Sequence, residues 1–264
     1  MQDTSIYPNA PIALVLLEVR HPPSDLSNPA VALLKKELAS HVPIERNETI
    51  VDLNVETGER HATVLRKLVA RDLHTAVTFR TDSVVVETTD YRGWAWFRRL
   101  VGDVLRARHE VAPLDGSERI GLRYIDEIRV PDASPVDWSK WVSSALLGPR
   151  EQLADLGLIL ERQQSVVQYR TDTPGHTFTL RFGAGTGTVI QSTDNLKRPI
   201  EPSSNGEFFL VDTDGAWVDA SGRIPEFDSE SILGVCDSIH SPIKLMFESL
   251  ITDRLRKEVL DDAK

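Results

Sequence analysis

The clearest pattern in the sequence is the alternation within Arg119-Ile-Gly-Leu-Arg-Tyr-Ile-Asp-Glu-Ile-Arg-Val130. In an extended chain, one face of this stretch is apolar apart from Asp126, and the other face is mostly polar. A period of two residues held over this length predicts a β-strand with one face in the core. The apolar face carries Ile120, Leu122, Tyr124, Ile128 and Val130, and the polar face carries Gly121, Arg123, Ile125, Glu127 and Arg129.

Antiparallel strands are predicted on both sides of this stretch. The nearly continuous apolar run 12–20 is typical of a strand that is buried on both faces or lies at the centre of a sheet. Another strand is predicted over 46–57. Two alternating runs, 76–80 and 83–87, are joined by Thr81-Asp82, which favours a tight hairpin.

The second half of the chain contains further predicted strands, over 158–170, 176–182, 188–192 and 207–212. The segment Gly183-Ala-Gly-Thr-Gly187 is predicted to be a hairpin turn, because no Lys lies within it and a strand rather than a helix follows. A second hairpin is predicted across Thr213-Asp214-Gly215 to a short strand at 216–218.

Helices are predicted from apolar stripes and capping residues. Ser27 is expected to cap a helix that runs to about residue 40, and Asp90 to cap a helix over 94–107. The stripe of that second helix has apolar residues at 97, 100, 101, 104 and 105. Short helices are predicted near 63–70 and 139–145. A long helix is predicted over 228–259, which Pro242 should kink or split.

Together these elements predict an α+β protein, in which mostly antiparallel sheets are packed by long amphipathic helices. Pro131 to Pro135 is interpreted as a hinge between an N-terminal half, 1–131, and a C-terminal half, 136–264. The halves are expected to pack intimately and to resemble each other in their order of elements.

The composition of the sequence indicates the cellular compartment of the protein. The single cysteine, Cys236, precludes an intrachain disulfide, fits a reducing compartment and is expected to be buried and structural. No stretch reaches the roughly 20 apolar residues of a membrane-spanning helix. The run 12–19 is interrupted by Glu18 and lacks a basic segment before it, unlike a secretory signal. The sequence therefore predicts a cytoplasmic protein with no membrane contact.

The formal net charge of −10 argues against a general nucleic-acid binder. Residues 60–130 nevertheless hold 13 Lys and Arg against 10 Asp and Glu. Much of this excess comes from one helix. Its arginines either form a surface for an anionic partner such as nucleic acid, or pair with nearby carboxylates on a solvated face. They are Arg98, Arg99, Arg106 and Arg108.

No metal, cofactor or nucleophile motif is recognised. The seven histidines include no His-x-x-x-His pair, and a single cysteine cannot form a thiolate cluster. No Gly-x-Ser-x-Gly is present. We therefore predict no cofactor, no metal and no catalytic residue, and lean towards a protein that is not an enzyme.

Six residues are the candidates for binding. Arg123, Glu127 and Arg129 form a row that suits an anionic ligand or an acidic partner, or alternatively a ladder of cross-strand ion pairs. His240, three residues after Asp237, is either a partly buried core histidine or a functional one. The remaining candidates are Tyr124 and Asp126. An enzyme site assembled from Arg123, Asp126, Glu127 and His240 is the alternative hypothesis.

Several segments together resemble a sporadically distributed bacterial protein family of similar length with no assigned activity. They are Asn9-Ala-Pro-Ile12, Asp90-Tyr-Arg-Gly-Trp-Ala-Trp-Phe97, the Gly-Leu-Arg-Tyr-Ile strand from Gly121, and His240 with Phe247-Glu-Ser-Leu-Ile-Thr252. Members often have Asn where this chain has Asp126. The resemblance implies one full-length unit in a bacterial cytoplasm, transfers no catalytic residue, and suggests an accessory role in a defence or toxin–antitoxin system.

We therefore predict a non-enzymatic binding module. It is expected to bind through its sheet face or through the groove between its halves. The expected partner is another protein, a second copy of the chain or a small ligand, with nucleic-acid contact through the Arg-rich helix as a further alternative.

Overall fold

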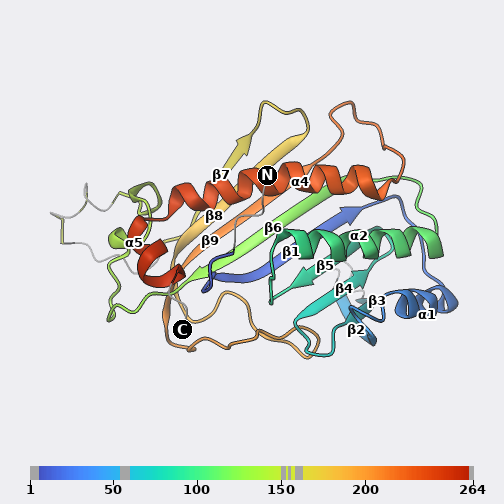
Figure 1. Ribbon diagram of the computed structural model, residues 1–264, viewed down its shortest axis with the longest axis horizontal. Helices are drawn as coiled ribbons and strands as arrows, with labels where there is room; N and C mark the ends of the chain where they lie inside the picture. The colour runs from blue at the N-terminus through green and yellow to red at the C-terminus, as the bar shows by residue number, and fades with distance from the viewer. Residues whose placement is uncertain (1–5, 54–59, 150–152, 154–155, 158–162, 262–264) are drawn as a thin grey trace.

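The computed structural model of the chain describes residues 6–53, 60–149, 153, 156–157 and 163–261. Within these residues, nine strands form one antiparallel sheet in the order β2-β3-β4-β5-β1-β6-β9-β8-β7. Helices α2 (Trp94–Val111) and α4 (Ser229–Leu250) lie side by side over one face of this sheet (Figure 1). The predicted α+β class is confirmed, but as one sheet rather than several.

The sheet gives no evidence of two similar halves. Its centre is β6 (Arg119–Ile128), which pairs with β1 (Ile12–Arg20) on one side and with β9 (Glu207–Trp217) on the other. Strands from both sides of the predicted hinge are therefore hydrogen-bonded neighbours.

The strand pattern of the N-terminal region largely follows the sequence. The predicted hairpin is confirmed as β4 (Thr75–Phe79) and β5 (Ser83–Thr88), and β5 pairs with β1. β2 (Ile44–Leu53) lies at one edge of the sheet; the end of its predicted range, 54–57, is outside the described residues. α1 (Asn28–Glu37) starts after Ser27, whose Oγ accepts a hydrogen bond from Ala30 N–H, as predicted.

The helix predicted near 63–70 is wrong, because these residues belong to β3 (Arg60–Val69). Leu65 and Leu68 are both buried and lie three residues apart, which imitates helical spacing in a short window. Hydrogen bonding to β2 and β4 on its two sides holds this segment extended.

The turns predicted at two glycine segments are also wrong. β8 (His176–Thr186) continues through the first segment as far as Thr186, and β9 runs unbroken through Thr213-Asp214-Gly215. Gly215 lies under α4, where an added Cβ would stand only 2.4 Å from Ile239 Cγ2. These glycines therefore allow a close approach of neighbouring groups within a strand rather than a turn.

The connection from β8 to β9, residues 187–206, carries no strand, so the strand predicted at 188–192 is wrong. At the other edge of the sheet, β7 (Ser165–Arg170) pairs only with β8 among the described residues. The start of its predicted range includes 158–162, which lie outside the described residues.

Three predictions about helices differ from the structure. α2 begins after Gly93, while Asp90 accepts hydrogen bonds from Arg92 instead of capping the helix. The predicted helix 139–145 is two short 3-10 turns, Trp138–Lys140 and Ser144–Leu146. Pro242 lies inside α4 without splitting it.

The C-terminal helix is shorter than predicted. Asp228 caps α4, and its Oδ2 accepts from Ser231 N–H at 2.8 Å. The helix stops at Leu250 because Ile251 is extended and forms a β-bridge with Val142. α5 (Asp253–Leu255) and a π-turn over Arg256–Leu260 follow.

The core fills the space between the sheet and the helices. One cluster lies under α2 and α4, and a second surrounds Trp141. Cys236 is fully buried in the first cluster, and burial raises the pKa of its thiol to about 12, so the predicted structural cysteine is confirmed. Among the described helices, none is both long enough and apolar enough to cross a bilayer.

The close packing at Gly215 can be tested by substitution. We expect Gly215→Val to lower the free energy of unfolding by about 1–3 kcal/mol, because its side chain must displace Ile239 or Phe178. Gly234→Ala is the control, since an added Cβ there meets no atom within 4 Å and should raise stability by up to about 1 kcal/mol through helix propensity. Urea denaturation measures both; equal effects of the two substitutions would contradict the packing described.

Candidate functional site

A cavity of about 500 Å³ opens on the face of the sheet that carries the helices. It lies among α4, the start of α2, the end of β6 and the segment that precedes β1. Its lining is largely apolar and aromatic, with a few charged groups, which is typical of sites that bind small molecules. The charged or ionisable lining residues are Tyr7, Tyr91, Tyr124, Asp126, His240, Lys244, Glu248, Arg256 and Asp261.

Aromatic rings from separate segments form one wall of this cavity. Trp94, at the start of α2, stacks on His240 of α4 with 4.2 Å between ring centroids and 5° between planes. Tyr91 and Tyr124 meet edge to face at 5.4 Å, and their hydroxyls are 2.9 Å apart in a hydrogen bond. These rings give this wall of the cavity an aromatic surface.

Asp237 holds the stacked pair in place. It lies one helical turn before His240 and accepts a hydrogen bond from Trp94 Nε1 at 2.7 Å. The guanidinium of Arg98, one turn after Trp94, donates to the same carboxylate at 3.0 Å. The packing of α2 against α4 therefore fixes the indole over the imidazole.

Asp126 is the buried carboxyl of the cavity. The residue is 5% exposed and lines the cavity. Within the described part of the chain, its carboxyl has no hydrogen bond and no ion pair. Burial raises the pKa of Asp126 to about 8, and the negative charge of Asp212 on β9 adds to this. At neutral pH the carboxyl is therefore mostly protonated.

The segment before β1 closes one side of the cavity. Tyr7 Oη donates to Glu248 of α4 at 2.9 and 3.0 Å, and Arg256 Nε donates to the same carboxylate at 3.0 Å. Burial and then the bond to Glu248 raise the pKa of Tyr7 to about 12. Asn9 Nδ2 also donates to the carbonyl of Val259. Residues near both ends of the chain thus meet at the cavity.

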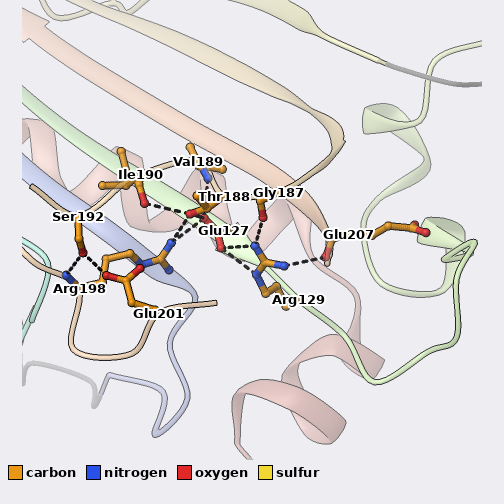
Figure 2. A network of polar contacts seen from close by, with 10 residues as sticks. All are labelled: Glu127, Arg129, Gly187, Thr188, Val189, Ile190, Ser192, Arg198, Glu201 and Glu207. Atoms are coloured by element: carbon orange, nitrogen blue, oxygen red, sulfur yellow. Dashed lines mark hydrogen bonds and ion pairs between the residues drawn. The ribbon is translucent and has the colours of Figure 1, made fainter. Parts of the chain in front are cut away.

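Glu127, the next residue along β6, lies on the opposite face of the sheet. Its side chain is fully buried and accepts bonds from Arg129, Arg198 and Val189 N–H (Figure 2). Burial by itself raises the pKa of Glu127, but these donors together lower it below its usual value. The network fastens the 187–206 connection to the sheet.

Arg123, the remaining residue of the predicted row, and its neighbour Arg119 are also engaged in ion pairs. Arg123 donates two hydrogen bonds to Asp212, at 2.7 and 2.6 Å, across the β6–β9 pair. Arg119 donates a hydrogen bond to the carboxylate of Glu18 at 3.0 Å across the β1–β6 pair. The polar face of β6 is thus a ladder of cross-strand ion pairs, which was one of the two interpretations of its sequence.

The Arg-rich surface predicted on α2 is smaller than expected. Arg108 is 0% exposed and donates to the backbone carbonyls of Ser24 and Ala112. The prediction that it lies on the surface is therefore wrong. Arg98 pairs with Asp237 and Arg106 with Asp103, whereas Arg99 is exposed. Acidic groups therefore alternate with the remaining arginines.

The structure brings together three of the six candidate binding residues. Tyr124, Asp126 and His240 line the cavity, while Arg123 lies on the other face. Glu127 and Arg129 line a second cavity of about 420 Å³, which shares the segment before β1. The four residues of the hypothetical enzyme site thus do not converge.

Sequence reasoning missed other lining residues, notably Tyr7, Tyr91, Trp94 and Glu248. The sequence did contain one indication of this aromatic wall, since Tyr91 and Trp94 are aromatic residues three positions apart at the start of a helix. Within the described residues, no group of three or more His, Cys, Asp or Glu could hold a metal ion.

Comparison of the sequence with models of protein families and with curated proteins gives no match. The site is therefore interpreted from its own geometry.

The Glu127 network predicts a pH-dependent contribution to stability. We expect Glu127→Gln to lower the free energy of unfolding at pH 7 by about 2–3 kcal/mol, because two guanidiniums lose their shared carboxylate. Since the pKa of Glu127 is lowered in the folded state, this stabilisation is present above the unfolded Glu pKa of about 4.3 and is lost as the pH falls below it.

Urea denaturation at pH 7 and at pH 3 measures this contribution. Glu258→Gln is the matched control, because among the described residues Glu258 forms only an exposed pair with Arg254, so its loss should change stability by at most about 0.5 kcal/mol. An equal loss for Glu127→Gln at both pH values would contradict the network described.

Proposed function

We propose that the chain is a non-enzymatic binding protein that holds a small organic ligand in the cavity between α4 and β6. The observation that carries this proposal is the Asp126 carboxyl, which is buried, lines an aromatic cavity and has no partner within the described residues. A pocket of this size and lining suits a ligand of drug-like dimensions.

The position of Asp126 supports a ligand. Its carboxyl lines the cavity and has no hydrogen bond among the described residues, so it is available to bond a molecule held there. Neighbours of Asp126 on the same face of β6, Leu122 and Ile128, are fully buried apolar residues, so the sheet requires no charge there. A polar residue that the packing of the fold does not require is expected where a site serves binding or chemistry.

A second candidate function is general acid catalysis by Asp126. It is favoured by one observation, the pKa of about 8, which allows the carboxyl to donate a proton near neutral pH. Simple binding is preferred because Arg123 and Glu127, two of the four residues of the hypothetical enzyme site, face away from the cavity.

Three predictions from the sequence concern the biological role of the protein. They are the resemblance to a sporadic bacterial family, an accessory role in a defence or toxin–antitoxin system, and association with another protein or a second copy of the chain. One element suits such association: β7 is an edge strand on which Val166, Val167 and Tyr169 are exposed.

Native mass spectrometry of protein gently purified from bacterial cells tests the proposal. We expect the wild type to carry a small molecule and Trp94→Ala to lose it, because the substitution removes the indole from the wall of the cavity. Trp96→Ala is the matched control: Trp96 lies in the same turn of α2, outside the described lining of the cavity, under the guanidinium of Arg92.

Circular dichroism should show that both variants are folded. An equally retained ligand in Trp94→Ala, or no ligand on any of the three proteins, would contradict the proposal. A ligand altered by the wild type but not by Asp126→Asn would establish the second candidate instead.

A further inference from the structure

The charges of the cavity are not equivalent. Glu248 and Arg256 neutralise each other through a 3.0 Å ion pair, and Asp261 is exposed. Asp126 differs from them because it is buried and its carboxyl has no ion pair or hydrogen bond among the described residues, although Lys244 and His240 line the same cavity. A cationic group on a ligand would supply that partner.

The wall around Asp126 suits the same kind of group. Tyr124 shares its face of β6, and Tyr124 contacts both Tyr91 and His240, which in turn stacks on Trp94. Trp and Tyr faces attract ammonium groups through their ring quadrupoles, most strongly where water is excluded. The Asp126 carboxylate lines the same cavity and would add an ion pair.

Other classes of ligand fit less well. A purely apolar ligand would leave the carboxyl without a partner, at a cost in free energy. An anionic ligand would be repelled whenever Asp126 is ionised. An ammonium group satisfies both the carboxylate and the rings.

On the basis of the function proposed above, we infer that the ligand carries a cationic ammonium group, which binds against the Asp126 carboxylate and the rings of Tyr91, Trp94 and Tyr124. Asp126 is the counter-ion of the site. The remainder of the ligand occupies the apolar part of the cavity between α4 and the segment before β1.

Cation binding should displace a proton. Because burial holds the pKa of Asp126 at about 8, the free protein is mostly protonated there at pH 7 and must ionise to form the ion pair. Binding of a cation should therefore release close to one proton at pH 7 and tighten as the pH rises towards 8. Other titratable or charged groups near Asp126 are Tyr124 on β6, Asp212 on β9, Tyr91 before α2, and His240, Lys244 and Glu248 on α4; Tyr7, Arg256 and Asp261 complete the lining.

Two probe molecules of nearly equal shape measure the effect of the ligand's positive charge on binding. Choline carries a quaternary ammonium that does not titrate, and 3,3-dimethyl-1-butanol replaces its nitrogen by carbon. We expect the wild type to bind choline at least about tenfold more tightly than the neutral alcohol. Isothermal titration calorimetry in two buffers of different ionisation enthalpy gives both the affinity and the number of protons released.

Asp126→Asn, which keeps the size of the side chain, should abolish both the preference for choline and the proton release. Asp261→Asn is the matched control, because it removes a carboxylate from the exposed part of the lining and should preserve both. Thermal melting of each variant shows that it is folded.

Several results would overturn the inference. Equal affinity for the two probes, or a preference for choline that survives in Asp126→Asn, would exclude Asp126 as a counter-ion. Failure of both probes, together with a neutral or anionic molecule on the purified wild type, would exclude a cationic ligand while leaving the proposed binding function intact. Failure of both probes with no molecule on the purified protein would overturn the binding function itself.

Discussion

The alternation of side chains along β6 is the constraint on which the rest of the structure depends. Because β6 is paired on both sides, by β1 and β9, its register is fixed and each residue is assigned to one face. Asp126 and Glu127 are adjacent carboxylic acids that this assignment sends to opposite faces. Glu127 meets two guanidiniums and a backbone N–H, which lower its pKa, whereas Asp126 enters an aromatic cavity that raises its pKa to about 8. Environment, and not residue type, separates their chemistry.

The cavity exists because distant parts of the chain converge on the Asp126 face. The stacking of Trp94 on His240 requires α2 and α4 to lie together, and Asp237 secures that arrangement through the indole N–H. Tyr7 and Asn9 bind α4 and the turn after α5, so the beginning and the end of the described chain form one side of the site. On the polar face of the sheet, by contrast, Arg123 pairs with Asp212, and Glu127 is bonded by Arg198 of the 187–206 connection.

Much of the fold could be predicted from sequence periodicity. The faces of β6, the β4–β5 hairpin, the α1 cap at Ser27 and the α+β class follow from local patterns. The failures have tertiary causes: Gly215 serves the approach of α4 to β9, and β3 is extended because two strands pair with it. The site was predicted only through Tyr124, Asp126 and His240, because no local pattern reveals that Trp94 will meet His240 or that Tyr7 will reach Glu248.

The most direct test of this account is the titration of the Asp126 carboxyl in the free protein. It can be followed by carbon-13 NMR with labelled aspartate, and the Asp126→Asn spectrum assigns the resonance. The account predicts a midpoint near pH 8, because the carboxyl is buried without a partner among the described residues. A midpoint near 4, the value of an ordinary solvated aspartate at about 3.9, would contradict it.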